Sequence, residues 1–497
     1  MSIVKWFKST YNLSSDYIFN DVIVSHKKVS IIYNEVLCDT RSIDNIIMYR
    51  LLLLNRKELD DLDNNIPYCN TKIICKEEIL DYLNNGFLII IYKNIYAFEI
   101  RSNLDRGVNT IESELSLSGP KDSFSEVFNT NLGLIRKRIK SSHLKMDISN
   151  VGRYTKNKIG ILYIDNICKK SLIDSIIKKL NKIDIDGIID SSYLKYSLED
   201  KYNLFPTIIT TERPDKCCMA LLEGKVIIIV DNSPYCLILP SLFLDFFHTT
   251  DDYFQKPFNT TFIRIIRLLA FFIAIFTPAI YISVTTRNYD LIPTSLLIML
   301  KAGRTFVPFP AYIEALFMIV CFEILKESDL RMSNTSGSSI SILGGLILGD
   351  CAVAAGIVSP IMIIVIAISS IAGLIFSSIE LVNTLRTYKL LLLILGTLFG
   401  IYGVIMGFIF MIYNICSTRV FGYSYLSFDK NEVLDSFIKI DKDKKYRNSK
   451  LTDNTYRGNY RWKSMLYLLL FLYFYYYLLK FLVIESLIIL LYLINWR

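Results

Sequence analysis

The sequence predicts a protein of the α+β and α-helical membrane class. We expect an N-terminal cytoplasmic α/β head of two subdomains, followed by a helical domain that spans a membrane several times. Residues 1–262 are mixed and charged, whereas residues 263–416 hold long apolar runs with few charges. This uneven distribution of apolar residues indicates the membrane class. The overall apolar share of 52% does not, because it is close to that of soluble proteins.

Charge and motif content narrow the function classes. The net charge of +8 is modest for 497 residues, and basic and acidic residues alternate through the head, so we expect no nucleic-acid partner. The ten cysteines form no CxxC pair and the three histidines are dispersed, so we expect neither a disulfide framework nor a metal site. No phosphate-binding loop, nucleophile elbow or zinc-protease motif stands in a fitting context, so we expect no enzyme and no cofactor.

Residues 1–118 are expected to form the first α/β subdomain. Ser42–Asp61 has the apolar spacing of a helix, and Gly86–Arg101 indicates two strands joined by a turn at Lys93-Asn94. Residues 119–156 are polar and predict a connector that contains one helix. The apolar stripe of that helix consists of Val127, Leu132, Ile135 and Ile139.

Residues 157–250 alternate strand and helix signals and predict the second α/β subdomain, with a mixed sheet. Ile159–Ile164 indicates a buried strand. Ser171–Ile183 indicates an amphipathic helix with a serine cap. Gly224–Pro240 indicates a strand, a turn and a second strand.

Residues 263–416 are expected to be the transmembrane helical domain, because one span needs roughly 20 apolar residues. Four stretches supply the predicted crossings: Ile265–Val284, the interrupted Thr294–Leu325, the long Ile340–Phe376 and Leu390–Cys416. The glycines of the last stretch form two pairs, each spaced by four residues, which favours close helix packing. They are Gly396, Gly400, Gly403 and Gly407.

The flanks set the predicted topology. The N-terminus has no apolar export segment, so we expect the head to stay in the cytoplasm. Residues 417–464 are rich in Lys and Arg and are expected to be cytoplasmic too, which requires an even number of crossings. Residues 465–496 form an atypical apolar tail in which Lys480 opposes insertion, so an extra span and a surface position both stay open.

Four ordered stretches between about Asn129 and Tyr425 resemble one known family, the A subunits of GerA-type spore germinant receptors. The head contributes NTNLGLIRKRIK from Asn129 and RPDKCCMALLEGKVIIIVDNSPYCLILP from Arg213. The helical region contributes DDYFQKPFNTTFIRIIRLLAFFIAIFTPAIYISVTT from Asp251. It also contributes AGRTFVPFPAYIEALFMIVCFEILKE, followed later by GLILGDCAVAAGIVSPIMIIVIA.

This resemblance implies a subunit of a nutrient sensor in the inner membrane of bacterial spores. It implies work with a transporter-like B subunit and a lipoprotein C subunit, contact with membrane lipid, and homo-oligomers of A subunits that form an ion pathway. The sequence departs from the family where Asp350 stands in place of a usual Gln and Ala354 in place of a usual Glu.

Ionisable residues inside a membrane are candidates for function because they are expensive to bury. Glu314 has two interpretations: a charge that faces water near a helix end, or a group that lines an ion path or pairs with Arg304. Asp350 lies in an apolar stretch and favours a pore or interhelical role. Pro308 and Pro310 break a helix, which indicates a kink that is either interfacial or part of a gate.

A second motif lies in the head and consists of Arg213, Pro214, Asp215, Glu223 and Gly224. No nucleophile or base accompanies it, so we expect a structural role in which Arg213 and Asp215 form a salt bridge or cap and Gly224 turns the chain. Two other functions stay open for the whole chain. One is a secondary transporter for a small solute, and the other is a membrane-anchored scaffold.

Overall fold

The computed structural model describes residues 14–55, 58–60, 62–66, 71–102, 114, 116, 118–200, 203–331, 349–426 and 451–452. The predicted apolar tail at 465–496 lies outside the described residues. So does most of the predicted basic segment 417–464.

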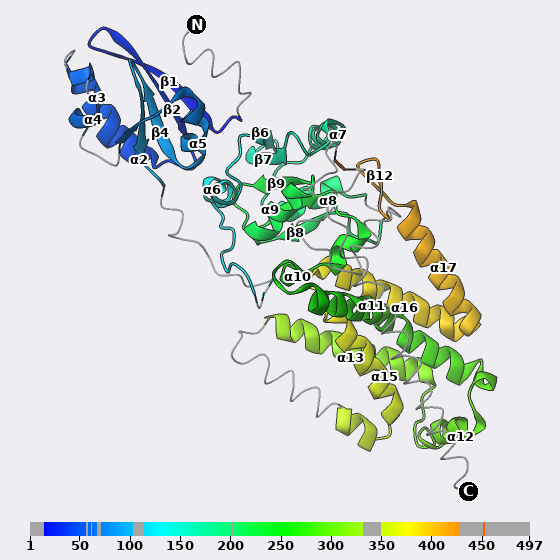
Figure 1. Ribbon diagram of the computed structural model, residues 1–497. Coiled ribbons are helices and arrows are strands. Elements are labelled where there is room, and N and C mark those ends of the chain that lie inside the picture. The colour runs from blue at the N-terminus through cyan, green and yellow to red at the C-terminus, as the bar shows by residue number, and fades with distance from the viewer. Residues whose placement is uncertain are drawn as a thin grey trace, which may run out of the picture. The chain divides into compact units, whose positions relative to one another are not determined.

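The first subdomain is an antiparallel five-stranded sheet with the strand order β1-β2-β4-β5-β3 (Figure 1). Its strands are β1 (Tyr17–Val24), β2 (Lys27–Asn34), β3 (Thr71–Ile73), β4 (Phe87–Ile91) and β5 (Ile95–Glu99). Helices cover both faces of this sheet, so alternate residues of β4 pack in different cores. Leu88 and Ile90 pack with the segment η1 (Ile43–Met48) and α3 (Tyr49–Leu53), whereas Ile89 packs with α5 (Ile79–Asn84).

The second subdomain has the same topology, with the order β6-β7-β9-β10-β8 and only antiparallel pairs. Its strands are β6 (Leu144–Val151), β7 (Asn157–Ile164), β8 (Ile209–Thr211), β9 (Val226–Val230) and β10 (Cys236–Leu239). Its main helices are α6 (Phe128–Arg138), α7 (Lys170–Leu180), α8 (Ser191–Leu198) and α9 (Pro214–Leu222). The predicted mixed sheet is therefore wrong: each pair of neighbours runs in opposite directions.

The two subdomains are an internal repeat. In both, two paired strands precede helices, a short edge strand, another helix and a final hairpin. The sequences still carry traces of this: Ile31-Ile32-Tyr33 in β2 corresponds to Ile161-Leu162-Tyr163 in β7, and a buried Cys38 or Cys168 follows at the same distance. Gly86 and Gly224, with φ of +80° and +87°, start the last hairpin of each repeat.

The repeats are completed by different parts of the chain. In the first repeat, the backbone of Cys38 forms an isolated antiparallel β-bridge with Arg101. The Asp39 amide donates to the Ile100 carbonyl beside it. In the second, Cys168 forms the matching bridge with Thr452, and the Lys169 amide donates to the Leu451 carbonyl at 3.3 Å. A segment that follows all the described helices therefore fills the position that the chain directly after β5 fills in the first repeat.

Several predicted elements have different limits in the structure. Helix α7 starts at Lys170 after an extended Lys169, so Ser171 is not its cap. The single helix predicted over Ser42–Asp61 is broken, because Leu54 adopts an extended conformation. Residues 119–156, predicted to form a connector with one helix, contain helix α6 and also strand β6. This strand is an edge strand of the second sheet, so the range is part of the second subdomain.

The helical domain consists of α11 (Pro257–Thr286), α12 (Thr294–Ala302), α13 (Ala311–Arg331), α15 (Pro360–Gly373), α16 (Ile379–Phe399) and α17 (Ile401–Ser417). Among the described residues, α11 and α16 are long and apolar enough to cross a membrane, while α15 and α17 are apolar but shorter. The break predicted inside Thr294–Leu325 is present, because residues 303–310 separate α12 from α13.

The prediction that Leu390–Cys416 is one span is wrong. This stretch contains the end of α16, a turn and α17, which together form a helical hairpin. Gly400 has a φ of +63° and separates α16 from α17, and the Asn288 side chain accepts from the Ile401 amide at 2.9 Å. A Cβ at Gly403 would lie 2.1 Å from the Leu395 carbonyl oxygen. Gly403 therefore allows close packing between the two helices of this hairpin, whereas Gly396 allows close approach to the Ala279 backbone of α11.

Candidate functional site

A buried carboxylate lies in the helical domain. Glu314 is 1% exposed and stands in the first turn of α13. Its Oε1 accepts from the Arg304 guanidinium at 2.7 Å, and its Oε2 accepts from the backbone amide and the hydroxyl of Ser359 at 3.1 and 3.0 Å. The water-facing interpretation of Glu314 is therefore wrong, and the predicted pairing with Arg304 is present.

Two helix starts stabilise this carboxylate. Glu314 lies in the first turn of α13, and Ser359 is the N-cap residue of α15, so the positive ends of both helix dipoles are close to its charge. Two further polar groups are buried here without a hydrogen-bond partner among the described atoms: the Tyr281 hydroxyl and the Arg304 Nε. The cluster joins α11, α13, α15 and the loop after α12 in an otherwise apolar bundle.

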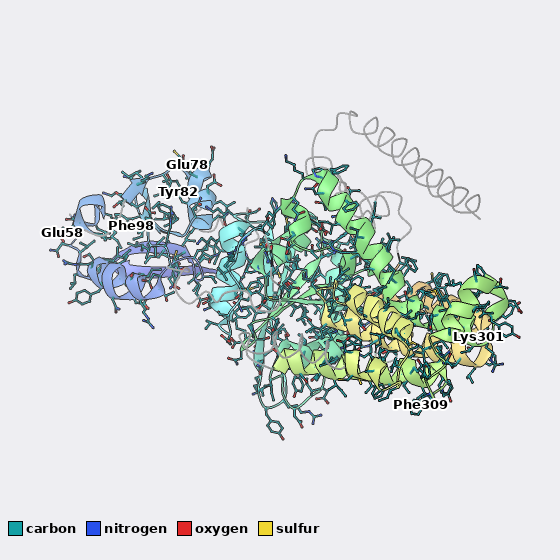
Figure 2. All side chains as sticks on the ribbon, turned by 90° about the horizontal axis from the view of Figure 1, so that it is seen from below. Glu58, Glu78, Tyr82, Phe98, Lys301 and Phe309 are labelled. Atoms are coloured by element: carbon teal, nitrogen blue, oxygen red, sulfur yellow. The ribbon has the colours of Figure 1, made fainter. Side chains whose placement is uncertain are left out.

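The remaining membrane candidates do not enter the cluster. Pro308 and Pro310 are exposed in the loop that leads into α13, where the Pro310 carbonyl accepts from the Glu314 amide at 3.3 Å. Lys301 and Phe309, labelled in Figure 2, flank the same loop. Asp350 is an exposed residue in a helical turn, and no contact brings it to Glu314.

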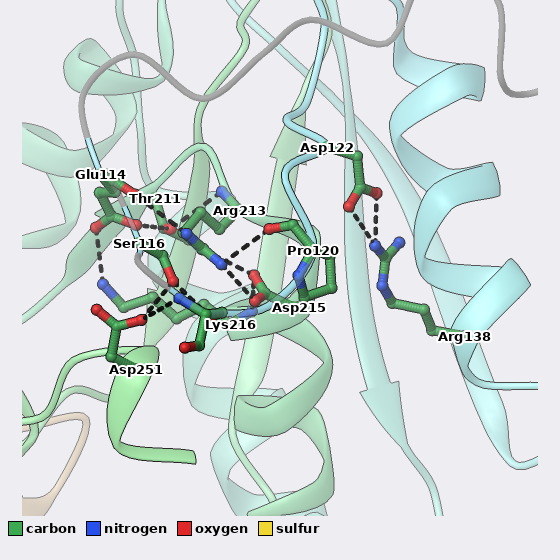
Figure 3. A network of polar contacts seen from close by, with 11 residues as sticks. Glu114, Ser116, Pro120, Asp122, Arg138, Thr211, Arg213, Asp215, Lys216 and Asp251 are labelled. Carbon is green, nitrogen blue, oxygen red and sulfur yellow. Dashed lines mark hydrogen bonds and ion pairs between the residues drawn. The ribbon is translucent and has the colours of Figure 1, made fainter. Parts of the chain in front are cut away.

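The head motif is a buried network, shown in Figure 3. Arg213 is fully buried and makes a two-point ion pair with Asp215, at 3.0 and 2.7 Å. Its Nη1 donates to the Glu114 carbonyl, and its Nη2, which also contacts Asp215, donates to the Pro120 carbonyl, at 3.2 Å each. The predicted Arg213–Asp215 pair is thus present, and it holds the chain that enters the second subdomain against α9.

The rest of the head motif shapes the start of α9 and the turn after it. Pro214 is the first residue of α9, where its missing amide costs nothing. Glu223 ends the helix and accepts from the Tyr253 hydroxyl at 3.3 Å. A Cβ at Gly224 would lie 2.1 Å from the Thr452 Cγ2, so a glycine is required by space as well as by its φ.

A charged cluster joins the head to the first long helix. Asp252, 2% exposed, accepts from the guanidinium of Arg267 at 2.7 and 2.9 Å and from that of Arg264 at 3.3 Å. Arg267 also donates to the Phe247 carbonyl at 2.9 Å. Because these groups are almost fully buried, the start of α11 is fixed to the chain that leaves the second sheet.

The start of α16 is attached to the same subdomain. The Lys195 ammonium of α8 forms an ion pair with Glu380, and the Thr384 hydroxyl donates to the Leu204 carbonyl at 2.6 Å. Phe205 of the head lies 5.2 Å from the Tyr388 ring, and Phe247 lies 5.7 Å from Phe376. A movement of the helices would therefore reach the second sheet.

Titratable groups of the head near this junction have altered pKa values. Burial raises the pKa of Glu199, although its carboxylate accepts from the amides of Thr207 and Ile208 at 2.7 and 3.0 Å. Partial burial acts to raise the pKa of Asp190 as well. There the hydrogen bonds from Ser192 and Ser233 outweigh burial, and the pKa is lowered.

Comparison with known proteins agrees with the family resemblance found in the sequence. The family model described as Bacillus/Clostridium GerA spore germination protein matches residues 5–450. The chain belongs to this family. Spore germination protein KA of Bacillus subtilis (strain 168) is 39% identical over 340 residues, which are 67% of this chain and 62% of that relative. The chain therefore matches less than two thirds of the length of germination protein KA.

Two further relatives match over more than two thirds of this chain. Spore germination protein GerQA of Bacillus cereus is 31% identical, with 79% of this chain and 80% of that protein covered. The uncharacterized membrane protein YfkQ of Bacillus subtilis (strain 168) is 36% identical, with coverages of 68% and 67%. A crystal structure of the N-terminal domain of the A subunit of the Bacillus megaterium germinant receptor GerK3 aligns at 26% identity with a TM-score of 0.38. It covers 48% of this chain and 94% of that domain.

Some residues of these sites have no sequence signal of their own. Ser359 and Tyr281 are ordinary residues in apolar stretches, and only the fold brings them to Glu314. Asp252 and Arg267 could have been found, because a charge inside the predicted entry to a span requires a partner. Throughout the described residues, no group of three or more His, Cys, Asp or Glu side chains is placed to hold a metal ion.

Proposed function

We propose that this GerA-family chain is the A subunit of a nutrient germinant receptor. It spans the inner membrane of the spore with its head in the cytoplasm, assembles with copies of itself, and couples sensing by a transporter-like B subunit and a lipoprotein C subunit to ion release. The observation that carries the proposal is Glu314, a fully buried carboxylate in an apolar helix bundle that is attached to the head.

The surface of the bundle supports a position in lipid. Contiguous exposed apolar surface marks contact with a membrane or another protein. The outward apolar residues of α17 include Tyr402, Met406, Phe410 and Tyr413. On α11 and α13 they include Phe262, Leu269, Leu316 and Val320.

In this proposal the pair Glu314–Arg304 holds the closed state. It joins the loop after α12 to the starts of α13 and α15, so separating these elements must break it. The anchor of Asp252 to Arg264 and Arg267 gives a rigid connection from the head to α11, which packs on the same cluster through Tyr281. Asp350 is a second candidate for the ion path, as an exposed carboxylate beside apolar segments.

The first prediction is that Glu314→Gln makes spores release ions without nutrient. Removing one partner of a buried ion pair costs about 3–5 kcal/mol. Arg304 keeps 22% exposure of its side chain, so we expect the lower end and a shift of about a hundredfold toward the open state. The measurement is ion efflux and loss of refractility in spores whose own A subunit has been replaced by the variant.

Asp290→Asn is the matched control, because it neutralises an exposed carboxylate at the same end of the bundle. The amount of A subunit in the membrane is checked by immunoblot. If spores carrying Glu314→Gln and spores carrying Asp350→Asn both respond to nutrient as wild-type spores do, a membrane-anchored scaffold is favoured instead. Loss of the A subunit should abolish the nutrient response and spare germination by a direct activator of the lytic enzymes.

A further inference from the structure

A cavity of about 80 Å³ lies between α11, α13, α15 and α16, apart from the Glu314 cluster. Its charged lining consists of Glu323 and Lys326 on α13 and of Arg386 and Lys389 on α16. Phe322 and Leu385 contribute apolar wall. The cavity therefore has a mostly apolar lining to which three cations and one carboxylate contribute.

Among the described residues that line the cavity, three cations share a single carboxylate. Glu323 pairs with Arg386 at 2.6 Å and is the one carboxylate among the described residues that line the cavity. Neither Lys326 nor Lys389 has a carboxylate within 4 Å in the described part of the chain, although Lys389 is only 7% exposed. The Arg386 Nε is also buried without a partner among the described atoms. Buried charges are normally paired, so the buried ammonium of Lys389, which lines the cavity together with Lys326 and Arg386, favours a bound anion.

The cavity lies toward the head side of the bundle. Glu380, at the start of α16, contacts Lys195 of the head, and Arg386 and Lys389 follow within about 15 Å of that start. In the proposed membrane orientation this is the cytoplasmic side, near the level of the lipid phosphates. Basic pockets between membrane helices on this side bind anionic lipid headgroups.

We propose that this cavity binds a phosphate group, carried by an anionic phospholipid. The proposal rests on the membrane position stated under Proposed function. Lys326, Arg386 and Lys389 contact the phosphate oxygens, and the apolar wall formed by Phe322 and Leu385 receives the first part of an acyl chain. The lipid then joins α13 to α16, the helix that is attached to the head.

The test uses the full chain purified in detergent and reconstituted with phosphatidylglycerol or with phosphatidylcholine. Retained lipid is counted by native mass spectrometry, and thermal unfolding is followed in parallel. We expect wild-type chain to retain phosphatidylglycerol and to gain thermal stability from it. The double variant Lys326→Gln with Lys389→Gln should lose about thirtyfold in affinity, because each lysine that attracts an anionic headgroup contributes about fivefold. Lys301→Gln, at the opposite end of the bundle, should match the wild type.

A folding defect is recognised in the absence of anionic lipid. In phosphatidylcholine the double variant should be at least as stable as the wild type, because it removes uncompensated buried charge. Equal retention of phosphatidylglycerol by wild type and double variant overturns the proposal. Stabilisation by millimolar inorganic phosphate with no lipid retained overturns the lipid assignment.

This outcome is separable from the proposed receptor function. A chain that stays in solution without detergent contradicts the membrane position itself. A chain that supports germination while the double variant retains lipid normally contradicts the cavity alone.

Discussion

At the scale of single residues, the buried polar groups of this protein have partners that the sequence only partly shows. The pairs Arg213–Asp215 and Arg304–Glu314 could be proposed from the sequence, because each joins residues that are close along the chain. Lys195 and Glu380 could not, since they come from different domains and neither stands in a motif. Charge type is visible in a sequence, whereas long-range partnership depends on the fold.

Asp190 allows a test at this scale. Its side chain accepts from the Ser192 amide at the start of α8 and from the Ser233 hydroxyl. We expect Asp190→Ala to lower the free energy of unfolding by about 1 kcal/mol at neutral pH. Because hydrogen bonding lowers the folded-state pKa of Asp190, its contribution is present above the unfolded pKa of about 3.9 and is lost as pH falls below it.

The measurement is chemical unfolding of both chains in detergent between neutral pH and pH 3. The gap in stability should close at the acid end. A gap that stays constant with pH would show that the carboxylate charge has no part in the cap.

At the scale of elements, sequence patterns located most strands and helices but not their relations. The hairpin of β4 and β5 and that of β9 and β10 were predictable, because turn residues separate two apolar runs. The run Leu390–Cys416 was mistaken for one span, since Gly400 is the only mark of a turn inside continuous apolar sequence. Hydropathy records what is apolar, and a tight turn with φ of +63° needs just one glycine.

The α16–α17 hairpin gives a prediction for close helix contact. In Gly403→Ala the new methyl would meet the Leu395 backbone, so we expect a loss of about 1–3 kcal/mol from overpacking. Gly373→Ala is the matched control, because a Cβ there meets nothing within 4 Å. Thermal unfolding in detergent measures both. Equal effects of the two substitutions would contradict the tight contact.

At the scale of the whole molecule, the sequence predicted two head subdomains followed by apolar helices, and the structure adds that the subdomains are repeats. Repetition was hidden because few matching residues survive, chiefly Tyr33 with Tyr163 and Cys38 with Cys168. The return of Leu451–Thr452 to the second sheet had no sequence signal either. A short bridge of two residues has no periodicity to detect.

This return can be tested by comparing the two repeats. We expect Gly224→Ala and Gly86→Ala both to destabilise the protein, because each glycine has a positive φ. Adding Thr452→Ser removes the Cγ2 that a Cβ at residue 224 would meet, so it should restore part of the loss caused by Gly224→Ala. Coupling of contacting residues is typically about 0.5–3 kcal/mol.

The same addition should leave Gly86→Ala unchanged, because Gly86 faces Leu37 and Arg101 instead. Unfolding of the wild type, the three single variants, including Thr452→Ser alone, and the two double variants in detergent gives both cycles. If the losses of stability caused by Gly224→Ala and Thr452→Ser simply add, the Thr452 side chain does not contact residue 224.

The bridge between Cys168 and Thr452 also sets an order of events during synthesis on the ribosome. The first repeat can fold as soon as its own residues have emerged, since Arg101 is part of it. The second repeat lacks its backbone contacts with Leu451 and Thr452 until every described helix of the bundle has been translated. A product cut short before Leu451 would therefore have an incomplete second repeat, and a protease can recognise this defect.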